Sequence, residues 1–362
     1  MPVGPARRLL AWFRAAARPL PWRTPLPRDP YRVLLSEVMA QQTQIDRVVP
    51  AWTSFMGRFP TVEALAAATE DEVLRAFTGL GYYRRARSLH AAARAITAAG
   101  HWPETFAGLR GLPGVGTYTA AAVAAFCFGG SEPPVDGNVA RVAARVGALA
   151  LPLGSPALIR RAREFAARLF ADARTPEVFE AVMELGASLC APAAPRCPAC
   201  PLRRDCAAAA SGSVTGYPLP RPQRAPEDHR WAVLWLERPD RRVLLSRVGP
   251  GRLLAGLWLP PFAELIDGAD PARAARSLAR LAGHDGRLAR AEPVTHSITH
   301  RRIVVAPFVG AVTSFGVGER REGWGWHDPD RLTVGTSSLL AKLRSTCTRP
   351  RGTTATRSRR TT

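Results

Sequence analysis

Almost no lysine occurs in this sequence. Among its 50 lysine and arginine residues the sole lysine is Lys342, so nearly every cationic side chain is a guanidinium. Arginine stays protonated in proteins, whereas burial can deprotonate the amine of a lysine. The chain before Lys342 therefore lacks a side-chain amine that could form a Schiff base with an aldehyde.

Long apolar runs are also missing, as are acidic residues near the start. No uninterrupted apolar stretch approaches the roughly 20 residues of a membrane-spanning helix. Arg14 interrupts the weakly apolar segment Leu9–Ala17, so a secretory signal is not indicated. The absence of acids before Asp29 also occurs in organelle transit peptides, but core-like sequence already begins at residues 20–22. We expect a cytoplasmic monomer that does not bind membranes.

The charge is strongly unbalanced. The chain has 50 basic and 29 acidic residues, which gives a formal net charge of +21. Such an excess favours a polyanionic partner, because basic side chains neutralise phosphates and release their counterions. A solvated basic surface with no such partner is the alternative interpretation.

The pattern of the sequence changes once along the chain. Up to about Leu189 apolar residues recur at helical spacing, whereas alternating β-rich runs appear only after a segment rich in proline and arginine. We expect a multidomain protein with an all-α domain at residues 1–217, a linker at 218–228, an α+β domain at 229–345 and a disordered basic tail at 346–362.

Local motifs predict individual elements. Asp29-Pro30 is typical of a helix start, and we expect this helix to continue through Ile45. Turn residues around Pro239 predict a hairpin between two β-rich runs. The elements expected in the second domain are strands at 230–237, 242–248 and 303–309 and a helix at 271–282.

Four of the six cysteines lie in one short segment: Cys190, Cys197, Cys200 and Cys206. Thiolates are soft ligands that suit an iron–sulfur cluster or zinc. Common structural zinc sites use two Cys-x2-Cys pairs, and only one such pair is present here. Disulfides would be unusual in a cytosolic chain of this size. The spacing indicates a metal centre and leaves cluster, zinc and disulfides open.

A glycine-containing turn precedes an alanine-rich helix that is expected from Tyr118 to Phe126. The turn includes Leu112, Gly114 and Gly116. Glycines let the backbone approach a ligand closely, and amides at a helix N-terminus can hold a phosphate oxygen. The pattern is that of a helix-hairpin-helix motif, and a plain helix–turn–helix connection is the alternative.

Two carboxylates are candidates for acid–base chemistry. Glu37 lies in the expected helix among apolar neighbours, which should raise its pKa and suit it to act as a general acid. Asp136 directly precedes a helix expected to start near Val139. By itself Asp136 is better explained as an N-cap, and Glu37 as an ordinary helix-surface residue.

Taken together, the motifs resemble adenine DNA glycosylases of the MutY family, within the endonuclease III superfamily. The resemblance runs from about Leu9 to Cys206. It rests on motifs that occur in the family's order: Leu20–Arg23, Ser36–Gln44, Gly79–Tyr83, Leu112–Gly116, Val135–Asn138 and the cysteine segment. The run around Glu37 points to the adenine branch.

The resemblance implies two helical lobes with the target base flipped into the cleft between them. It implies that Glu37 protonates N7 of adenine and that Asp136 stabilises or captures the oxocarbenium sugar, while Tyr118 and Asn138 help to hold the site. The four cysteines would carry a [4Fe-4S] cluster. Positions lining the adenine pocket are matched by Trp22, Arg23, Gln42 and Glu180, and Tyr82 matches the residue that wedges into the duplex.

Position 118 also bears on strand cleavage. Relatives that cleave the DNA strand carry a lysine there, which forms a Schiff base. This chain has Tyr118 and no lysine in the whole helical region. The resemblance therefore implies a monofunctional enzyme.

The second domain resembles the Nudix-like domain of the same family, through residues 243–247 and 256–260. The metal-binding glutamates of the Nudix pyrophosphatase box are missing, which indicates a reader of damaged DNA and not a hydrolase. Where the family has Phe-Ser-His to recognise oxidised guanine, this chain has Ile298-Thr299-His300. A buried structural histidine is the alternative for His300.

The sequence thus predicts an adenine DNA glycosylase of base excision repair that acts on duplex DNA with adenine opposite 8-oxoguanine or guanine. We expect such a protein to be nucleoid-associated. Two alternatives remain at this point. One is a glycosylase for another mismatch on the same scaffold, such as thymine opposite guanine. The other is a cluster-bearing DNA-binding protein without catalytic activity.

Overall fold

The computed structural model describes residues 4–222, 225–312 and 321–348, and the chain forms two compact units. Unit 1 comprises residues 1–68 and 84–223, and unit 2 comprises residues 69–83 and 224–362. The segment Thr69–Tyr83, expected within the helical domain, belongs to the unit formed by the C-terminal region.

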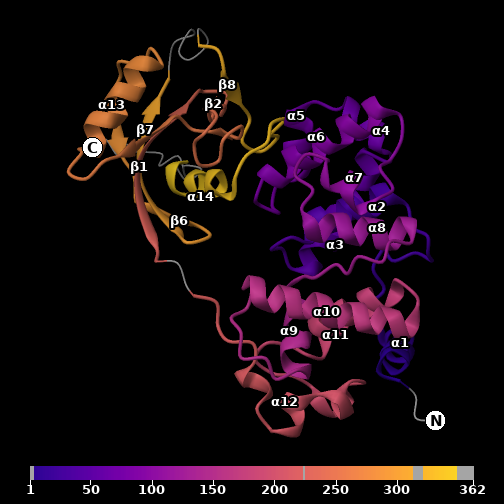
Figure 1. Cartoon of the computed structure of the whole chain (residues 1–362). Coiled ribbons are helices and arrows are strands. Elements are labelled where there is room, and N and C mark those ends of the chain that lie inside the picture. Colours follow the sequence, from indigo (N-terminus) through magenta and orange to yellow (C-terminus); the bar gives the residue numbers. More distant parts are fainter. Residues whose placement is uncertain (1–3, 223–224, 313–320, 349–362) are drawn as a thin grey trace, which may run out of the picture. The chain divides into compact units, whose positions relative to one another are not determined.

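Unit 1 is helical, as the spacing of its apolar residues predicts (Figure 1). Helix α2 packs against α8, while α9 packs against α10 and α11, and α1 packs against the latter two. None of the described helices is both long and apolar enough to cross a membrane. The helices are α1 Pro5–Ala16, α2 Pro30–Ala40, α3 Ile45–Arg58, α4 Val62–Ala67, α6 Arg84–Ala99, α7 Phe106–Arg110, α8 Thr117–Phe128, α9 Gly137–Val146, α10 Pro156–Ala173, α11 Glu177–Ser188 and α12 Ala207–Ala210.

The helix expected to continue through Ile45 is in fact two helices. It begins as predicted, with the Asp29 side chain accepting a hydrogen bond from the Arg32 amide at 3.0 Å. It ends at Ala40, because Gln42 adopts a left-handed φ of 56°. The buried guanidinium of Arg85 donates to the carbonyls of Val38, Met39 and Gln41 at 2.8, 2.8 and 2.5 Å. These bonds supply partners for carbonyls that the end of α2 leaves without hydrogen bonds inside the helix.

Unit 2 is α+β, as predicted, and its described residues are built on one sheet of eight strands. The central strands β1 and β7 pair in parallel along their whole length, and β1 and β2 form the expected antiparallel pair. The elements are α5 Glu70–Ala76, β1 Glu227–Glu237, β2 Val243–Arg247, β3 Trp258–Leu259, β4 Phe262–Leu265, α13 Pro271–Leu281, β5 Ala289–Arg290, β6 Val294–Ile298, β7 Arg301–Ala311, β8 Trp324–His327 and α14 Ser338–Cys347.

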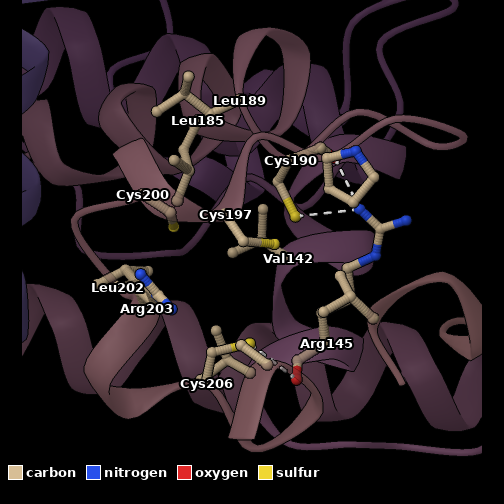
Figure 2. A pocket seen from close by; sticks show the side chains of 14 residues that line it. Val142, Arg145, Leu185, Leu189, Cys190, Cys197, Cys200, Leu202, Arg203 and Cys206 are labelled. Atoms are coloured by element: carbon tan, nitrogen blue, oxygen red, sulfur yellow. Dashed lines mark hydrogen bonds between the residues drawn. The ribbon is translucent and has the colours of Figure 1, made fainter. Parts of the chain in front are cut away.

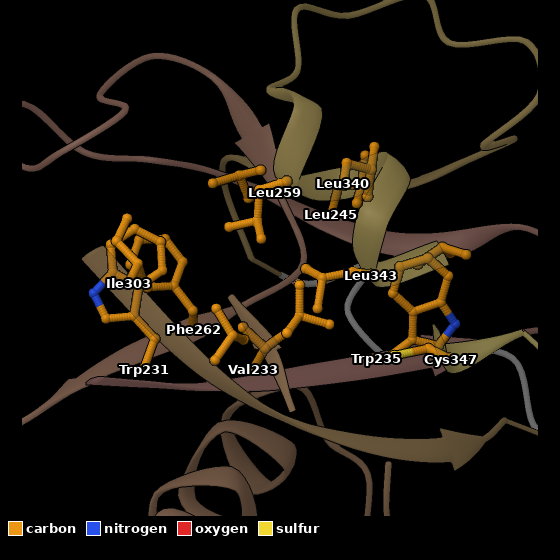
Figure 3. Close-up of a cluster of buried hydrophobic side chains, with 14 of the residues drawn as sticks. Trp231, Val233, Trp235, Leu245, Leu259, Phe262, Ile303, Leu340, Leu343 and Cys347 are labelled. Carbon is orange, nitrogen blue, oxygen red and sulfur yellow. The ribbon is translucent and has the colours of Figure 1, made fainter. Parts of the chain in front are cut away.

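The alternation of side chains along β1 builds two cores. Trp231, Val233 and Trp235 face the core that includes α14, where Leu340 and Leu343 are buried (Figure 3). Leu234 and Leu236, on the opposite face of β1, belong to the second core, which includes Leu278 of α13. The last helix extends to Cys347, beyond the expected domain end at residue 345, and residues 349–362 of the expected tail lie outside the described residues.

Candidate active site

Glu37 lies in the third turn of α2, on the edge of a pocket in unit 1. Burial raises the pKa of Glu37 to about 7. A hydrogen bond from Tyr118 and the positive charge of Arg28 oppose this rise, whereas the negative charges of Asp136 and Glu180 add to it. A carboxylic acid with such a pKa is protonated in about half of the molecules at neutral pH, so it can donate a proton there.

Asp136 is the N-cap of α9, which confirms the plainer interpretation of this residue without excluding a second role. One carboxylate oxygen accepts from the Val139 amide at 2.7 Å, and the other accepts from Nδ2 of Asn138 at 2.8 Å. Burial raises the pKa of Asp136, and these donors together with Arg141 oppose that rise. The donors hold the carboxylate in one orientation and stabilise its charged form.

The side chain of Asn138 is itself held in place by Arg141. Its Oδ1 accepts from Nη2 of Arg141 at 2.7 Å, and the same nitrogen donates to the Gly186 carbonyl at 2.8 Å. Gly186 of α11 is required for this packing, because a Cβ there would lie 2.6 Å from the Cβ of Asn138. The close approach of α9 and α11 thus orients the groups around Asp136.

Tyr118 is the second residue of α8, and its side chain lines the same pocket. The hydroxyl hydrogen-bonds to Glu37 and lies 3.7 Å from the sulfur of Met183. Burial, followed by the nearby carboxylates, raises the pKa of Tyr118 well above its ordinary value, so it stays a neutral donor.

The pocket has a volume of about 490 Å³, enough for a nucleobase and part of its sugar. It brings together every residue that sequence reasoning assigned to catalysis or to the adenine pocket. Those residues are Trp22, Arg23, Glu37, Gln42, Tyr118, Asp136, Asn138 and Glu180. Trp22 is nearly buried and contacts the ring of Trp52, with 5.7 Å between ring centroids.

A buried ion-pair chain forms one wall of the pocket, and sequence reasoning found only part of it. Arg23 donates to Glu180 at 2.7 Å and to Glu184 at 3.0 Å. Arg28 donates to the other oxygen of Glu180 at 2.7 Å, and Arg18 donates to Glu184 at 2.7 Å. Burial opposes ionisation of Glu184, but the hydrogen bonds from Arg18 and Arg23 outweigh it and lower its pKa.

The sequence did carry a signal for the missed members Arg18, Arg28 and Glu184. Glu180 and Glu184 are four residues apart on α11, so they share a face, and both are buried. Two buried carboxylates on one face require cationic partners. The arginines near the N-terminus are the residues that supply them.

The glycine-containing turn joins α7 to α8, as expected of a helix-hairpin-helix motif. Gly114 has a φ of 72°, and a Cβ there would lie 2.2 Å from the Cβ of Ser88, so only glycine fits. Gly116 is the exposed N-cap of α8, and a Cβ there would meet no atom within 4 Å. Leu112 accepts the backbone hydrogen bond of Val115 that closes the turn.

The four clustered cysteines line one cavity in unit 1 (Figure 2). Burial raises the pKa of Cys200 to about 11 and also raises that of Cys206, so both are thiols until a metal displaces the proton. Among the described residues, no group of three or more His, Cys, Asp or Glu side chains forms a set arranged to hold a single metal ion. The thiols surround the cavity and do not meet at one point.

Two arginines of α9 tie the cysteine segment to the pocket. Arg145 is fully buried and donates to the sulfur of Cys190 at 3.3 Å and to four carbonyls, those of Cys190, Ala191, Pro192 and Tyr217. Arg141, which orients Asn138, also donates to the Cys190 carbonyl at 2.9 Å. A continuous chain of hydrogen bonds therefore joins Asp136 to the first cysteine.

Unit 2 holds the remaining site candidates. Thr299 and His300 form the tight turn between β6 and β7, where Thr299 adopts a φ of 56°. Its hydroxyl donates to the Ile298 carbonyl at 2.6 Å, and Nε2 of His300 lies 3.0 Å from Glu227. His300 is half-buried, so it is neither fully exposed nor the buried structural histidine of the alternative interpretation. Tyr82 belongs to the same unit and is 40% exposed.

Known proteins match this chain along most of its length. Residues 35–156 match the family model described as "HhH-GPD superfamily base excision DNA repair protein". The adenine DNA glycosylase of Mycolicibacterium smegmatis is 42% identical over 228 residues, which cover 62% of this chain and 75% of the relative. The human adenine DNA glycosylase is 36% identical over 303 residues, which cover 69% of this chain.

A solved structure of a thermostable thymine-DNA glycosylase is also similar, with 26% sequence identity and a TM-score of 0.49. The similar region covers 57% of this chain and 95% of that chain. The match spans 56% of the length of the human relative and 60% of that of the rat relative. This chain matches the mycobacterial relative, contains the helix-hairpin-helix region, and brings Glu37, Tyr118 and Asp136 together in one pocket. It therefore belongs to the adenine DNA glycosylase family.

Proposed function

We propose that this protein is a monofunctional adenine DNA glycosylase that hydrolyses the N-glycosidic bond of adenine opposite 8-oxoguanine or guanine in duplex DNA. The observation that carries the proposal is the single pocket that holds Glu37, with a pKa raised to about 7, together with Asp136. A general acid and a carboxylate at one site are what departure of a base from a sugar requires.

Glu37 is the proposed general acid. Its carboxylic acid donates a proton to N7 of a flipped adenine, and the pair of electrons in the bond between C1′ and N9 then leaves with the neutral base. Tyr118 hydrogen-bonds to Glu37 and orients it. The other carboxylates raise the pKa of Glu37, which keeps more of it in the protonated form that can act.

Asp136 is the proposed partner of the oxocarbenium sugar. Its negative charge opposes the positive charge that develops at C1′, and its hydrogen bonds to Val139 and Asn138 prevent it from turning away. Water then adds to C1′ and gives up one proton to the carboxylate left on Glu37, which restores the general acid and leaves an abasic sugar. A covalent bond between Asp136 and C1′, later hydrolysed by water, reaches the same product.

The ion-pair chain holds the pocket wall in place. Glu180 and Arg23 are locked to each other at 2.7 Å, so a carboxylate acceptor and a guanidinium donor keep fixed positions beside the base. Because the polar side chains of this wall are already paired, they do not need to rearrange when the base enters. This lowers the free-energy cost of binding the base.

A [4Fe-4S] cluster is the proposed cofactor, held by Cys190, Cys197, Cys200 and Cys206. The four thiols surround a cavity, which suits a polynuclear cluster better than a single ion. When bound, the cluster supplies four metal–thiolate bonds that cross-link the loop. The purified protein should absorb broadly at about 400 nm and contain iron and sulfide. Stoichiometric zinc without iron in protein purified under nitrogen would contradict the assignment.

A single-turnover assay tests the proposed activity. Enzyme in excess is mixed with duplexes that contain adenine opposite 8-oxoguanine, adenine opposite guanine, or thymine opposite guanine, and the released base is identified. We expect free adenine from the first two duplexes and no thymine from the third. Thymine release would favour the alternative mismatch glycosylase, and duplex binding without any base release would favour a non-catalytic DNA-binding protein.

A further inference from the structure

The segment Thr69–Tyr83 is joined to unit 1 by the chain at both ends, yet it packs with the C-terminal region as part of unit 2. The clearest contact is at its end, where the buried hydroxyl of Tyr83 donates to the Thr336 carbonyl at 2.5 Å. These two residues are 253 positions apart. A hydrogen bond over that separation fixes the end of the segment on the region just before α14.

A second contact lies one residue earlier in the C-terminal region. A Cβ at Gly335 would be 2.7 Å from the Cβ of Leu74 and 3.2 Å from its backbone, so α5 lies directly against the glycine. Gly335 is held in place because its carbonyl accepts from the Trp258 amide of β3 at 2.9 Å. Leu74 is fully buried. This contact depends on the absence of a side chain at position 335.

A third contact is electrostatic. Nη2 of Arg247 on β2 lies 3.2 Å from Glu70 and 3.6 Å from Asp71, both in the first turn of α5. These side chains are a third or more exposed, so the pairs stabilise the contact only weakly. The hydroxyl bond and the close packing at Gly335 are therefore the main anchors of the segment.

The anchored segment ends in an exposed aromatic side chain. Tyr82 directly precedes Tyr83, adopts a left-handed φ of 50° and is 40% exposed, and the two glycines before it, Gly79 and Gly81, also have positive φ. A non-glycine residue in this conformation is maintained only where its surroundings fix it. An exposed aromatic ring in a DNA-binding protein can stack on a base or enter a base step.

We propose that Tyr83 is a positioning residue, which together with Gly335 holds Tyr82 on the C-terminal unit so that the ring meets the DNA strand read by that unit. Unit 2 then contributes two elements to recognition, the Tyr82 ring and the turn at Thr299. This inference rests on the proposed function, because it assigns the role of Tyr82 in binding the mispaired duplex.

Two variants of the full-length protein weaken the anchor from opposite sides. Tyr83→Phe removes the hydroxyl, and Gly335→Ala places a Cβ against Leu74. Tyr31→Phe is the matched control, because the Tyr31 hydroxyl also donates to a buried backbone carbonyl, that of Phe59 at 2.7 Å, but lies in unit 1. Tyr82→Ala removes the ring altogether and shows how large the change in the readout is when the ring is absent.

The readout is fluorescence of 2-aminopurine placed next to 8-oxoguanine in a duplex whose adenine carries a 2′-fluorine, which slows base release. A ring that enters the stack unstacks the 2-aminopurine and raises its fluorescence. We expect Tyr83→Phe and Gly335→Ala to lose most of the increase that Tyr82→Ala loses. We also expect them to lower the preference for 8-oxoguanine over guanine by about 5-fold, the usual effect of one buried hydrogen bond.

The control decides between positioning and general stability. Tyr31→Phe should lower the melting temperature about as much as Tyr83→Phe while keeping the fluorescence increase of the unchanged protein. The inference is wrong if Tyr83→Phe and Gly335→Ala give the same fluorescence as Tyr31→Phe. If Tyr83→Phe does not fold, Gly335→Ala alone provides the test. A normal fluorescence increase, combined with no adenine release from the same duplex made without the 2′-fluorine, would contradict the proposed function and leave the positioning role standing.

Discussion

The polar groups in the pocket of unit 1 and those at the turn of unit 2 differ in burial and in their hydrogen-bond partners. In the pocket, Glu180 and Glu184 are buried and each is bonded to two arginines. At the turn, Thr299 is exposed, and within the described part of the chain its hydroxyl bonds to its own neighbours, Ile298 and His300. Buried, paired groups have fixed positions and shifted pKa values, whereas exposed ones can change partners at little cost.

This difference indicates a division of work. Chemistry that depends on a set pKa belongs in the pocket, and discrimination between similar partner bases belongs at a surface that DNA can cover. Changes in the pocket should therefore alter the rate of base release by large factors. Changes at the turn should alter the preference between 8-oxoguanine and guanine by small ones.

The largest effect is expected for Glu37→Gln. The amide has nearly the same shape but cannot donate a proton to N7, so single-turnover adenine release should fall by at least about 100-fold. Affinity for the duplex should stay within about 2-fold, since the charge of one group in the pocket contributes little to phosphate binding. A variant that keeps near-normal turnover would remove Glu37 from the mechanism.

Release of adenine should also depend on pH, through the pKa of Glu37 near 7. The protonated acid is the active form, so the rate should be constant well below pH 7 and fall up to about tenfold per pH unit above it. The measurement is the single-turnover rate of the full-length protein across this range. A rate that instead rises through pH 7 would indicate a general base in place of an acid.

A smaller effect is expected at the turn. Thr299→Ala removes one hydroxyl that can bond to the lesion, so the preference for 8-oxoguanine over guanine should fall by about 5-fold, while release opposite guanine stays unchanged. Ser297→Ala is the control, because Ser297 is also exposed but lies on β6 outside the turn. Equal preference in the two variants would mean that Thr299 does not read the lesion.

The smallest expected signal is strand cleavage, which should be absent. Tyr118 cannot form a Schiff base, and the only lysine, Lys342, is in unit 2, where it donates to the Thr295 carbonyl at 3.0 Å. Borohydride should therefore trap no efficient covalent adduct on an adenine-containing duplex. An adduct that survives Lys342→Ala would show that the N-terminal amine or another group acts as the nucleophile, and the monofunctional assignment would be wrong.

Much of the site could be predicted because its residues lie in short continuous motifs. Glu37 and Asp136 stand beside characteristic neighbours, and the cysteines lie close together in the chain. The ion-pair chain was missed in part because it joins residues about 160 positions apart, such as Arg23 and Glu184. Nothing local marks which arginine, among so many, meets a given buried carboxylate.

Two features of the fold could not be predicted for the same reason. The helix through Glu37 ends early where Gln42 adopts a left-handed φ, and Arg85, from a helix far along the chain, binds the carbonyls at that end. Similarly, Thr69–Tyr83 has the capping box of an ordinary helix, Thr69 with Glu72, and no local sign that it packs with the C-terminal region. In both cases tertiary contacts override a correct reading of local propensity.

The central claim is that Glu37 acts by protonating N7 of adenine. It is tested most directly by a cycle of two changes, Glu37→Gln in the protein and 7-deazaadenine for adenine in the duplex, since 7-deazaadenine has no N7 to accept a proton. We expect each change alone to slow single-turnover release by at least about 100-fold, and both together to slow it no further. Losses that multiply would mean that Glu37 and N7 act independently, which would contradict this mechanism.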